Sequence, residues 1–317
     1  NKKYLEIRKK LEFNLTNDQN NALKEINYDL QSKNKMFRIL QGDVGSGKTI
    51  VALISAFNVV NSGYQVAFMA PTEILASQHF LLAKKLFSKD IKIELLTSKM
   101  DAKIKKNIQE KSINGSIDII FGTHSLFQKK INFFNLGYII IDEQHKFGVN
   151  QRKALSDKGG INCDVLLMSA TPIPRTLTMT MYGDMDLSII KEKPKSRKEI
   201  KTYSKIDTKI NDVINFVKKS IKEGNQIFWV CPLIEESKKL DHQSAIEKYR
   251  SLNKLFPNKV GLLHSKIDTD EKEEILNKFL NKKYLVLVST TIIEVGIDFP
   301  NANVIIIENS NRFGLSQ

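Results

Sequence analysis

The sequence predicts an α/β protein made of two halves, each built on a parallel β-sheet and joined by a short linker. Short apolar runs, typical of buried strands, alternate with longer amphipathic stretches that are typical of helices. A charged, proline-containing segment at residues 191–198 interrupts this alternation, which then resumes. The length of 317 residues is sufficient for about two domains, each with its own core.

The alternation in the first half starts after Met36. Five apolar runs are expected to be buried strands: Phe37–Leu40, Val66–Met69, Ile117–Phe121, Tyr138–Ile141 and Val165–Met168. Helical patterns lie between them, the clearest at Ile50–Val60 and Glu73–Phe87. Such an alternation of strands and helices is typical of a parallel sheet that is covered by helices on both faces.

The second half repeats the alternation after the linker. Four apolar runs are expected to be strands: Gln226–Val230, Val260–Leu263, Leu285–Val288 and Val304–Ile307. This half has no glycine-rich phosphate-binding loop, so the two halves are not an obvious duplication of one active unit. We therefore expect a first domain at residues 1–190, a linker at 191–199 and a second domain at 200–317.

The charge of the chain leaves nucleic-acid binding open. A formal net charge of +14 favours a nucleic-acid partner, because lysine neutralises phosphates and releases counterions. Nearly all of this charge is lysine, however, and asparagine and isoleucine are also abundant. A coding genome rich in A and T produces the same bias without any selection for binding.

The remaining composition favours a cytoplasmic protein without a membrane partner. No apolar run approaches the roughly 20 residues that a membrane span needs. Cys163 and Cys231 belong to no C-x-x-C pair, so two reduced core cysteines are expected rather than a zinc site. The start at Asn1 resembles neither a signal peptide nor a translation start, so we expect the chain to begin inside a longer protein.

The strongest local motif is a glycine-rich loop between an expected strand and an expected helix. The loop fits the pattern G-x-x-x-x-G-K-[ST] and consists of Gly42, Asp43, Val44, Gly45, Ser46, Gly47, Lys48 and Thr49. In such a loop, backbone amides and a helix N-terminus surround phosphate oxygens. Lys48 is expected to reach the β- and γ-phosphates of ATP, and Thr49 is expected to bind Mg²⁺.

An acidic motif follows the expected strand Tyr138–Ile141. Asp142 comes at the carboxyl end of this strand, where α/β sheets bind ligands, and is expected to hold Mg²⁺ opposite Thr49. Glu143 is then placed to orient and deprotonate the attacking water. The two motifs together predict an NTPase that uses Mg²⁺.

Five further segments resemble the ordered motifs of superfamily 2 helicases of the DExH type. They are Leu15–Gln19, Ala70–Ala76, Gly122–His124, Ser169–Thr171 and Ser289–Asp298. The resemblance rests on the order, the spacing and the strand-end positions of these segments. It extends from about Phe13 to the last residue. It implies two RecA-like lobes of the P-loop NTPase fold, the second of them incomplete, which ATP closes and hydrolysis reopens.

The resemblance also implies roles for individual residues. ATP is expected to contact the glutamine of the first segment, an aromatic ring before it and three later residues: Gln19, Phe13, His145, Gly296 and Asp298. Nucleic acid is expected at small, hydroxyl and imidazole side chains of both lobes: Pro71, Thr72, Gly122, Thr123, His124, His264, Thr290 and Thr291. Hydrolysis is expected to be coupled to movement by Gln144, His145, Ser169 and Thr171.

Longer matches at residues 41–49, 142–149, 170–176, 229–236 and 312–315 resemble the RecG family of DNA helicases. This resemblance implies a motor in the bacterial cytosol or nucleoid that moves on duplex DNA and remodels stalled forks and Holliday junctions. A monomer is expected, and a single-stranded-DNA-binding protein is a further candidate partner. The alternatives are a translocase similar to the transcription-repair coupling factor, a DExH RNA helicase and a DNA-binding module that binds nucleotide without turnover.

In the helicase family, arginines that complete the hydrolytic site lie in a segment that would follow Gln317. These arginines stabilise the charge that develops on the transferred phosphoryl group. We therefore expect residues 1–317 alone to bind ATP but to hydrolyse it poorly.

Overall fold

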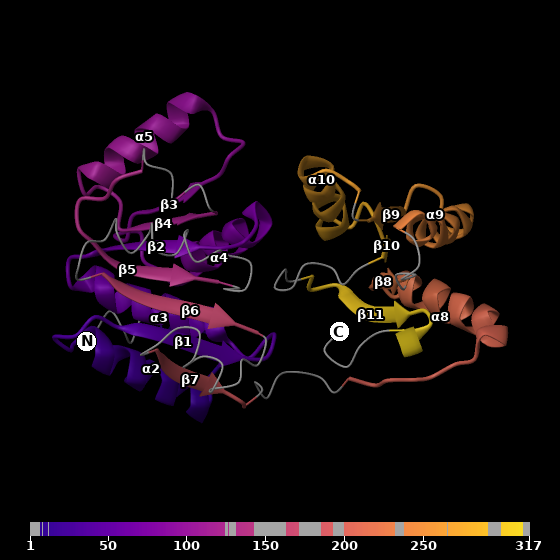
Figure 1. Cartoon of the computed structure of the whole chain (residues 1–317), viewed down its shortest axis with the longest axis horizontal. Coiled ribbons are helices and arrows are strands. Elements are labelled where there is room, and N and C mark those ends of the chain that lie inside the picture. Colours follow the sequence, from indigo (N-terminus) through magenta and orange to yellow (C-terminus); the bar gives the residue numbers. More distant parts are fainter. Residues whose placement is uncertain are drawn as a thin grey trace. The chain divides into compact units, whose positions relative to one another are not determined.

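The computed structural model describes residues 7, 9–11, 13–123, 126, 131–142, 163–170, 185–192, 200–231, 238–264, 266–290 and 299–312. The chain divides into two compact units, residues 1–198 and 199–317. Each unit is built on its own parallel sheet, which confirms the predicted fold class of two RecA-like lobes (Figure 1). Among the described residues, no helix has the length and apolarity that a membrane span requires.

The first unit contains a seven-stranded sheet with the strand order β3-β4-β2-β5-β6-β1-β7 (Figure 1). Its strands are β1 (Phe37–Gly42), β2 (Gln65–Met69), β3 (Ile93–Leu96), β4 (Ile119–Gly122), β5 (Leu136–Ile141), β6 (Asp164–Ser169) and β7 (Asp186–Ile190). Every pairing is parallel, so all strands end at the same edge of the sheet. The five predicted strands are confirmed with small shifts of their ends. The edge strands β3 and β7 were not predicted.

Helices cover the first sheet, and successive strand residues face opposite cores. The helices are α2 (Asn17–Leu30), α3 (Lys48–Asn61), α4 (Glu73–Leu86) and α5 (Ala102–Ile113). Leu40 packs into a core shared with α2, α3 and α4, whereas the preceding Ile39 packs into a second core that includes Ile108 of α5. Because both faces are covered, the central strands are mostly apolar.

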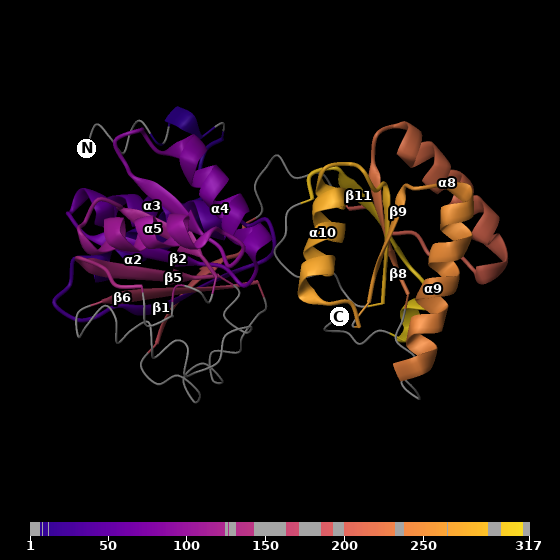
Figure 2. The same ribbon diagram turned by 90° about the horizontal axis from the view of Figure 1, so that it is seen from above.

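The second unit contains a four-stranded parallel sheet with the order β11-β8-β10-β9. Its elements are η3 (Asp207–Lys209), α8 (Ile210–Lys222), β8 (Gln226–Val230), α9 (Lys238–Leu255), β9 (Val260–Leu263), α10 (Thr269–Leu280), β10 (Val286–Ser289), β11 (Ala302–Ile307) and η4 (Ser310–Arg312). Figure 2 shows α10 on one face of this sheet and α8 and α9 on the other. All four predicted strands are confirmed.

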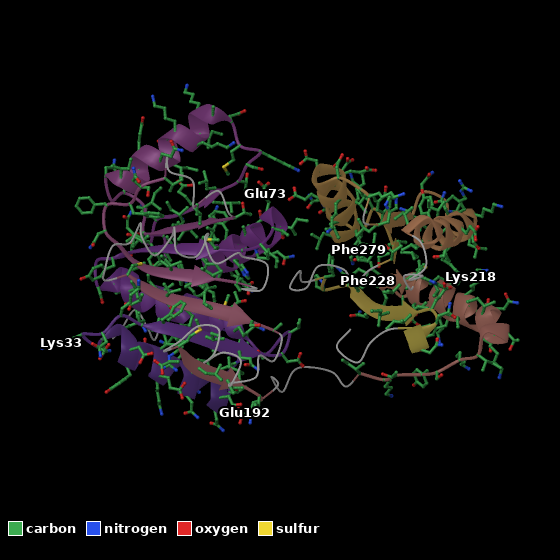
Figure 3. The ribbon with its side chains drawn as sticks, in the orientation of Figure 1. Lys33, Glu73, Glu192, Lys218, Phe228 and Phe279 are labelled. Carbon is green, nitrogen blue, oxygen red and sulfur yellow. The ribbon has the colours of Figure 1, made fainter. Side chains whose placement is uncertain are left out.

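Aromatic side chains fill the second unit on the side of α10. The ring centroids of Phe228, Phe279 and Phe299 lie 5.0–5.4 Å from one another. Figure 3 labels Phe228 of β8 and Phe279 of α10. Cys231, like Cys163 of the first unit, is buried and forms no disulfide. Burial raises the pKa of each of these thiols to about 12, so both remain protonated and unreactive near neutral pH. Both cysteines are therefore core residues, as predicted.

A buried arginine attaches α2 to the sheet of the first unit. Arg38 of β1 donates from Nε to Asp29 Oδ2 (2.7 Å) and from Nη1 to Ser188 Oγ (2.9 Å). A carboxylate oxygen of Glu25 lies 3.4 Å from the same Nη1. Asp29 and Glu25 belong to α2 and Ser188 to β7, so one guanidinium joins three elements. Its planar set of five donors suits several acceptors at once.

We expect Arg38→Met to lower the free energy of unfolding of the first unit by about 1–3 kcal/mol, because it removes the charged donor of the partly buried Asp29 carboxylate and of the buried Ser188 hydroxyl. Native-state hydrogen exchange of the slowest amides of β1 measures this change. Lys106→Met is the matched control, since Lys106 and Glu110 form an exposed ion pair at 3.9 Å. A loss no larger than that of the control would show that the Arg38 network does not hold the unit together.

Candidate nucleotide-binding site

The carboxyl edge of the first sheet gathers the predicted motifs side by side. Strands β5, β6 and β1 are neighbours in this order, so Asp142, Ser169 and the loop at 42–49 follow adjacent strand ends. Strand β2 pairs with β5 on the other side, and β4 pairs with β2. The segments that start at Ala70 and Gly122 therefore lie beside the acidic motif.

The loop between β1 and α3 surrounds the ammonium group of Lys48. This group donates to the carbonyl oxygens of Gly42 (2.6 Å) and Asp43 (3.1 Å), and Lys48 is largely buried. The hydroxyl of Ser46 is buried and has no hydrogen-bond partner among the described residues. A buried donor without a partner and a positive charge held on the loop both suit a phosphate ligand.

Gln19 contacts this loop directly. Its amide Nε2 donates to the Ser46 carbonyl (2.7 Å), and its Oε1 accepts from the backbone amide of Thr16 (2.9 Å). The Thr16 hydroxyl in turn accepts from the Gln19 backbone, which completes a capping box at the start of α2. Gln19 therefore attaches the start of α2 to the phosphate-binding loop. Phe13, expected to stack on adenine, has 44% of its surface exposed.

The contact with Gln19 requires glycine at position 47. Gly47 has φ +89°, and a Cβ added there would lie 2.3 Å from Gln19 Nε2. The left-handed backbone and the close approach of a buried, hydrogen-bonded side chain both disfavour larger residues. The contact with α2 therefore favours glycine at position 47, in addition to the requirement of phosphate binding.

Asp142 lies at the end of β5 with a buried partner that the sequence analysis did not identify. His79 of α4 approaches Asp142 through Nε2 at 2.8 Å from Oδ2, and both side chains are buried. The backbone amide of Asp142 donates to the Met69 carbonyl (2.9 Å). A carboxylate and the hydroxyl of Thr49 are the oxygen ligands that Mg²⁺ prefers, so these residues fit the implied metal.

The candidate nucleic-acid residues of the first unit follow β2 and β4, on the side of β5 away from the phosphate-binding loop. The Ala70 amide, one residue before Pro71, donates to the Gly122 carbonyl (2.9 Å). Thr72 caps α4, since its hydroxyl accepts from the Leu75 amide (3.3 Å). The hydroxyl of Thr123 is buried and unpartnered among the described residues.

The candidate residues of the second unit lie at neighbouring strand ends. His264 follows β9 and Thr290 follows β10, and the Thr290 amide donates to the Leu263 carbonyl (3.3 Å). The hydroxyls of Ser289 and Thr290 are buried without partners in the described part of the chain. The remaining predicted residues lie outside the described residues: His124, Glu143, Gln144, His145, Thr171, Thr291, Gly296 and Asp298.

A second feature absent from the sequence analysis is a contact between α2 and the segment after β7. The carboxylate of Asp18 accepts from the backbone amides of Lys191 (2.8 Å) and Glu192 (2.9 Å). The carboxylate of Glu192, which is labelled in Figure 3, accepts in return from the Asp18 amide. The distance between the two atoms is 3.3 Å. Lys191 and Glu192, the two residues after β7, are therefore bound to Asp18, which is adjacent to Gln19.

Comparison with known proteins identifies the class to which this fold and site belong. The family model for the DEAD/DEAH box helicase matches residues 16–180, and the model for the helicase conserved C-terminal domain matches residues 208–315. The chain therefore belongs to the DEAD/DEAH box helicase family. These two matches cover the described motifs of both units.

Within this family, the chain is similar to the ATP-dependent DNA helicase RecG. It is 48% identical over 100% of its length to RecG of Bacillus subtilis (strain 168), and 48% identical over 98% to RecG of Thermotoga maritima. It matches the structure of RecG bound to a three-way DNA junction with TM-score 0.85 and 43% identity over 98% of the chain. The chain covers 47%, 40% and 41% of these three proteins, respectively.

We expect Gly47→Ala to weaken ATP binding by about 10-fold or more, because a left-handed backbone costs alanine about 1–2 kcal/mol and the added methyl displaces Gln19. A titration with a fluorescent ATP analogue measures this. Gly63→Ala is the matched control, since Gly63 has φ +86° but nothing within 4 Å of an added Cβ. Equal ATP affinities in the two variants would exclude a role of the Gln19 contact in shaping the loop.

We expect Asp18→Ala to accelerate hydrogen exchange at the amides of Lys191 and Glu192. Asp101→Ala is the control, since Asp101 makes no capping hydrogen bond at the start of α5. The amides of Glu192 and Lys191 hold the pKa of the Asp18 carboxyl below its usual value of 3.8. The ionised carboxylate therefore stabilises the contact at neutral pH, and protection is lost only as pH falls through the lowered pKa. Unchanged exchange in Asp18→Ala would contradict this contact.

Proposed function

We propose that the chain is the motor of an ATP-dependent DNA helicase that moves along duplex DNA. The observation that carries the proposal is the shared sheet edge: the phosphate-binding loop, Asp142 and the segments at Ala70 and Gly122 follow neighbouring parallel strands. A nucleotide and a nucleic-acid backbone bound at one edge are close enough for each to affect the other. The similarity to RecG supports DNA rather than RNA as the track.

The proposed nucleotide half of the mechanism uses ATP and Mg²⁺. Lys48 binds the β- and γ-phosphates, and the amides of the loop and of the α3 N-terminus bind phosphate oxygens. Thr49 and Asp142 would hold Mg²⁺, which would supply positive charge to the phosphates. Glu143, the residue after Asp142, orients the attacking water and takes its proton.

The proposed nucleic-acid half grips phosphates rather than bases. Thr72 presents a helix N-terminus and Thr123 a hydroxyl, groups that bind phosphate without reading sequence. His264 and Thr290 provide the corresponding groups of the second unit. Translocation should therefore be independent of sequence and should weaken as salt concentration rises.

Branched DNA is the proposed substrate, namely stalled forks and Holliday junctions. The solved relative is bound to a three-way DNA junction, and the curated relatives are bacterial proteins. We accordingly propose action in the bacterial cytosol or nucleoid as a monomer, with a single-stranded-DNA-binding protein as a candidate partner.

We expect Lys48→Ala to reduce the DNA-stimulated ATPase of the full-length protein at least about 100-fold, because one charged contact to the transferring phosphate is lost. Phosphate release with a three-way DNA junction present measures this rate. Lys33→Ala is the control, since Lys33 is exposed on the surface (Figure 3). Stronger stimulation by single-stranded RNA than by the junction would instead favour an RNA helicase. Full activity in Lys48→Ala would refute the proposed ATP site.

A further inference from the structure

We infer that His79 is a positioning residue that orients the Asp142 carboxylate for Mg²⁺ and links it to the nucleic-acid end of α4. The inference rests on the function proposed above and adds a residue to it. It follows from the contacts of His79, from the helix that carries it and from the burial of both partners.

The His79–Asp142 contact is short, buried and directed. Nε2 and Oδ2 are 2.8 Å apart, and both side chains have 8% of their surface exposed. Because a carboxylate only accepts hydrogen bonds, the hydrogen lies on Nε2 and His79 is the donor. In such a buried position, rotation of the carboxylate would cost the hydrogen bond without any replacement from water.

The imidazole ring itself is held by packing. Its centroid lies 4.9 Å from that of Phe68 on β2, at an interplanar angle of 46°. Phe68 in turn stacks on Phe121 of β4 at 5.2 Å. The ring therefore cannot turn freely, and its orientation fixes that of Asp142. A partner of this kind, one step removed from the metal, usually changes metal affinity or activity by about 10- to 100-fold.

The helix that carries His79 begins at a candidate nucleic-acid contact. Thr72 caps α4, and the Glu73 carboxylate in its first turn accepts from the hydroxyl of Ser98 (2.6 Å). His79 follows Thr72 by about two turns, roughly 10 Å along the axis. A helix moves as a rigid element over this distance, so a phosphate bound at its N-terminus shifts or braces His79 and, through it, Asp142.

The competing explanation is that His79 only completes the core. Both explanations predict that removal of the histidine destabilises the protein. Only the positioning role predicts that divalent-cation affinity changes separately from nucleotide affinity, and that a side chain restoring the donor restores the cation affinity.

The test uses the full-length protein with His79→Phe, which keeps a ring against Phe68 but donates no hydrogen bond, and His79→Gln, which offers a donor amide. Ser55→Ala is the control because it removes another buried side-chain hydrogen bond between a helix and β5, the one that joins Ser55 of α3 to Tyr138 at 3.0 Å. ATP affinity is measured in EDTA with a fluorescent analogue. Mn²⁺ affinity of the nucleotide complex is measured from the EPR signal of free Mn²⁺.

We expect His79→Phe to weaken Mn²⁺ binding about 10-fold or more while ATP affinity in EDTA stays within about twofold. His79→Gln should recover part of the loss, and Ser55→Ala should change neither value. At saturating Mg²⁺, junction DNA should stimulate the ATPase of His79→Phe several-fold less than that of the wild type.

Wild-type Mn²⁺ affinity in His79→Phe, or an equal loss of ATP affinity in EDTA, would overturn the positioning role. Unchanged DNA stimulation of His79→Phe at saturating Mg²⁺ would overturn the link to α4. A wild-type protein that hydrolyses no ATP with junction DNA would refute the proposed function itself, so the two failures are distinguishable.

Discussion

The parallel pairing of the strands is the constraint on which the candidate site depends. Parallel strands end at one edge, and their hydrogen-bond register decides which residues meet there. Gln41 of β1 pairs with Ser169 of β6, and Met69 of β2 pairs with Ile141 of β5. Segments far apart in the chain therefore emerge side by side. A shift of one residue in β5 would turn Asp142 toward the other face of the sheet.

A second layer of contacts fixes these emerging segments. Gln19 attaches the phosphate-binding loop to α2, and Arg38 attaches α2 to β1 and β7. His79 of α4 likewise contacts Asp142 at the end of β5. The contacts of Gln19 and His79 each join a helix to a functional segment, so the loop and the carboxylate are held by the surrounding fold before any ligand arrives. Preorganised donors of this kind lose little entropy on binding.

The sequence predicts the central strands and the phosphate-binding loop well. Strands such as β2 are buried on both faces and appear as unbroken apolar runs, whereas β7 is half exposed and has no such run. The loop is recognisable because all of its residues are adjacent in the chain. The partners of Asp142 and Asp18 are distant in the chain, so spacing alone could not reveal them. The helical pattern places His79 between Leu75 and Ala83 on the buried face, a signal that it needs a polar partner.

The burial of α3 determines how genetic data on this segment can be interpreted. Ten of its 14 residues are buried, among them Ser55, which is hydrogen-bonded to the buried Tyr138. A helix enclosed on all sides has few positions where a substitution is neutral. Inactive variants at residues 50–59 would therefore map the packing of the first unit rather than contacts with the nucleotide. Within this helix, only the first turn, with Lys48 and Thr49, can separate loss of ligand binding from loss of the folded state.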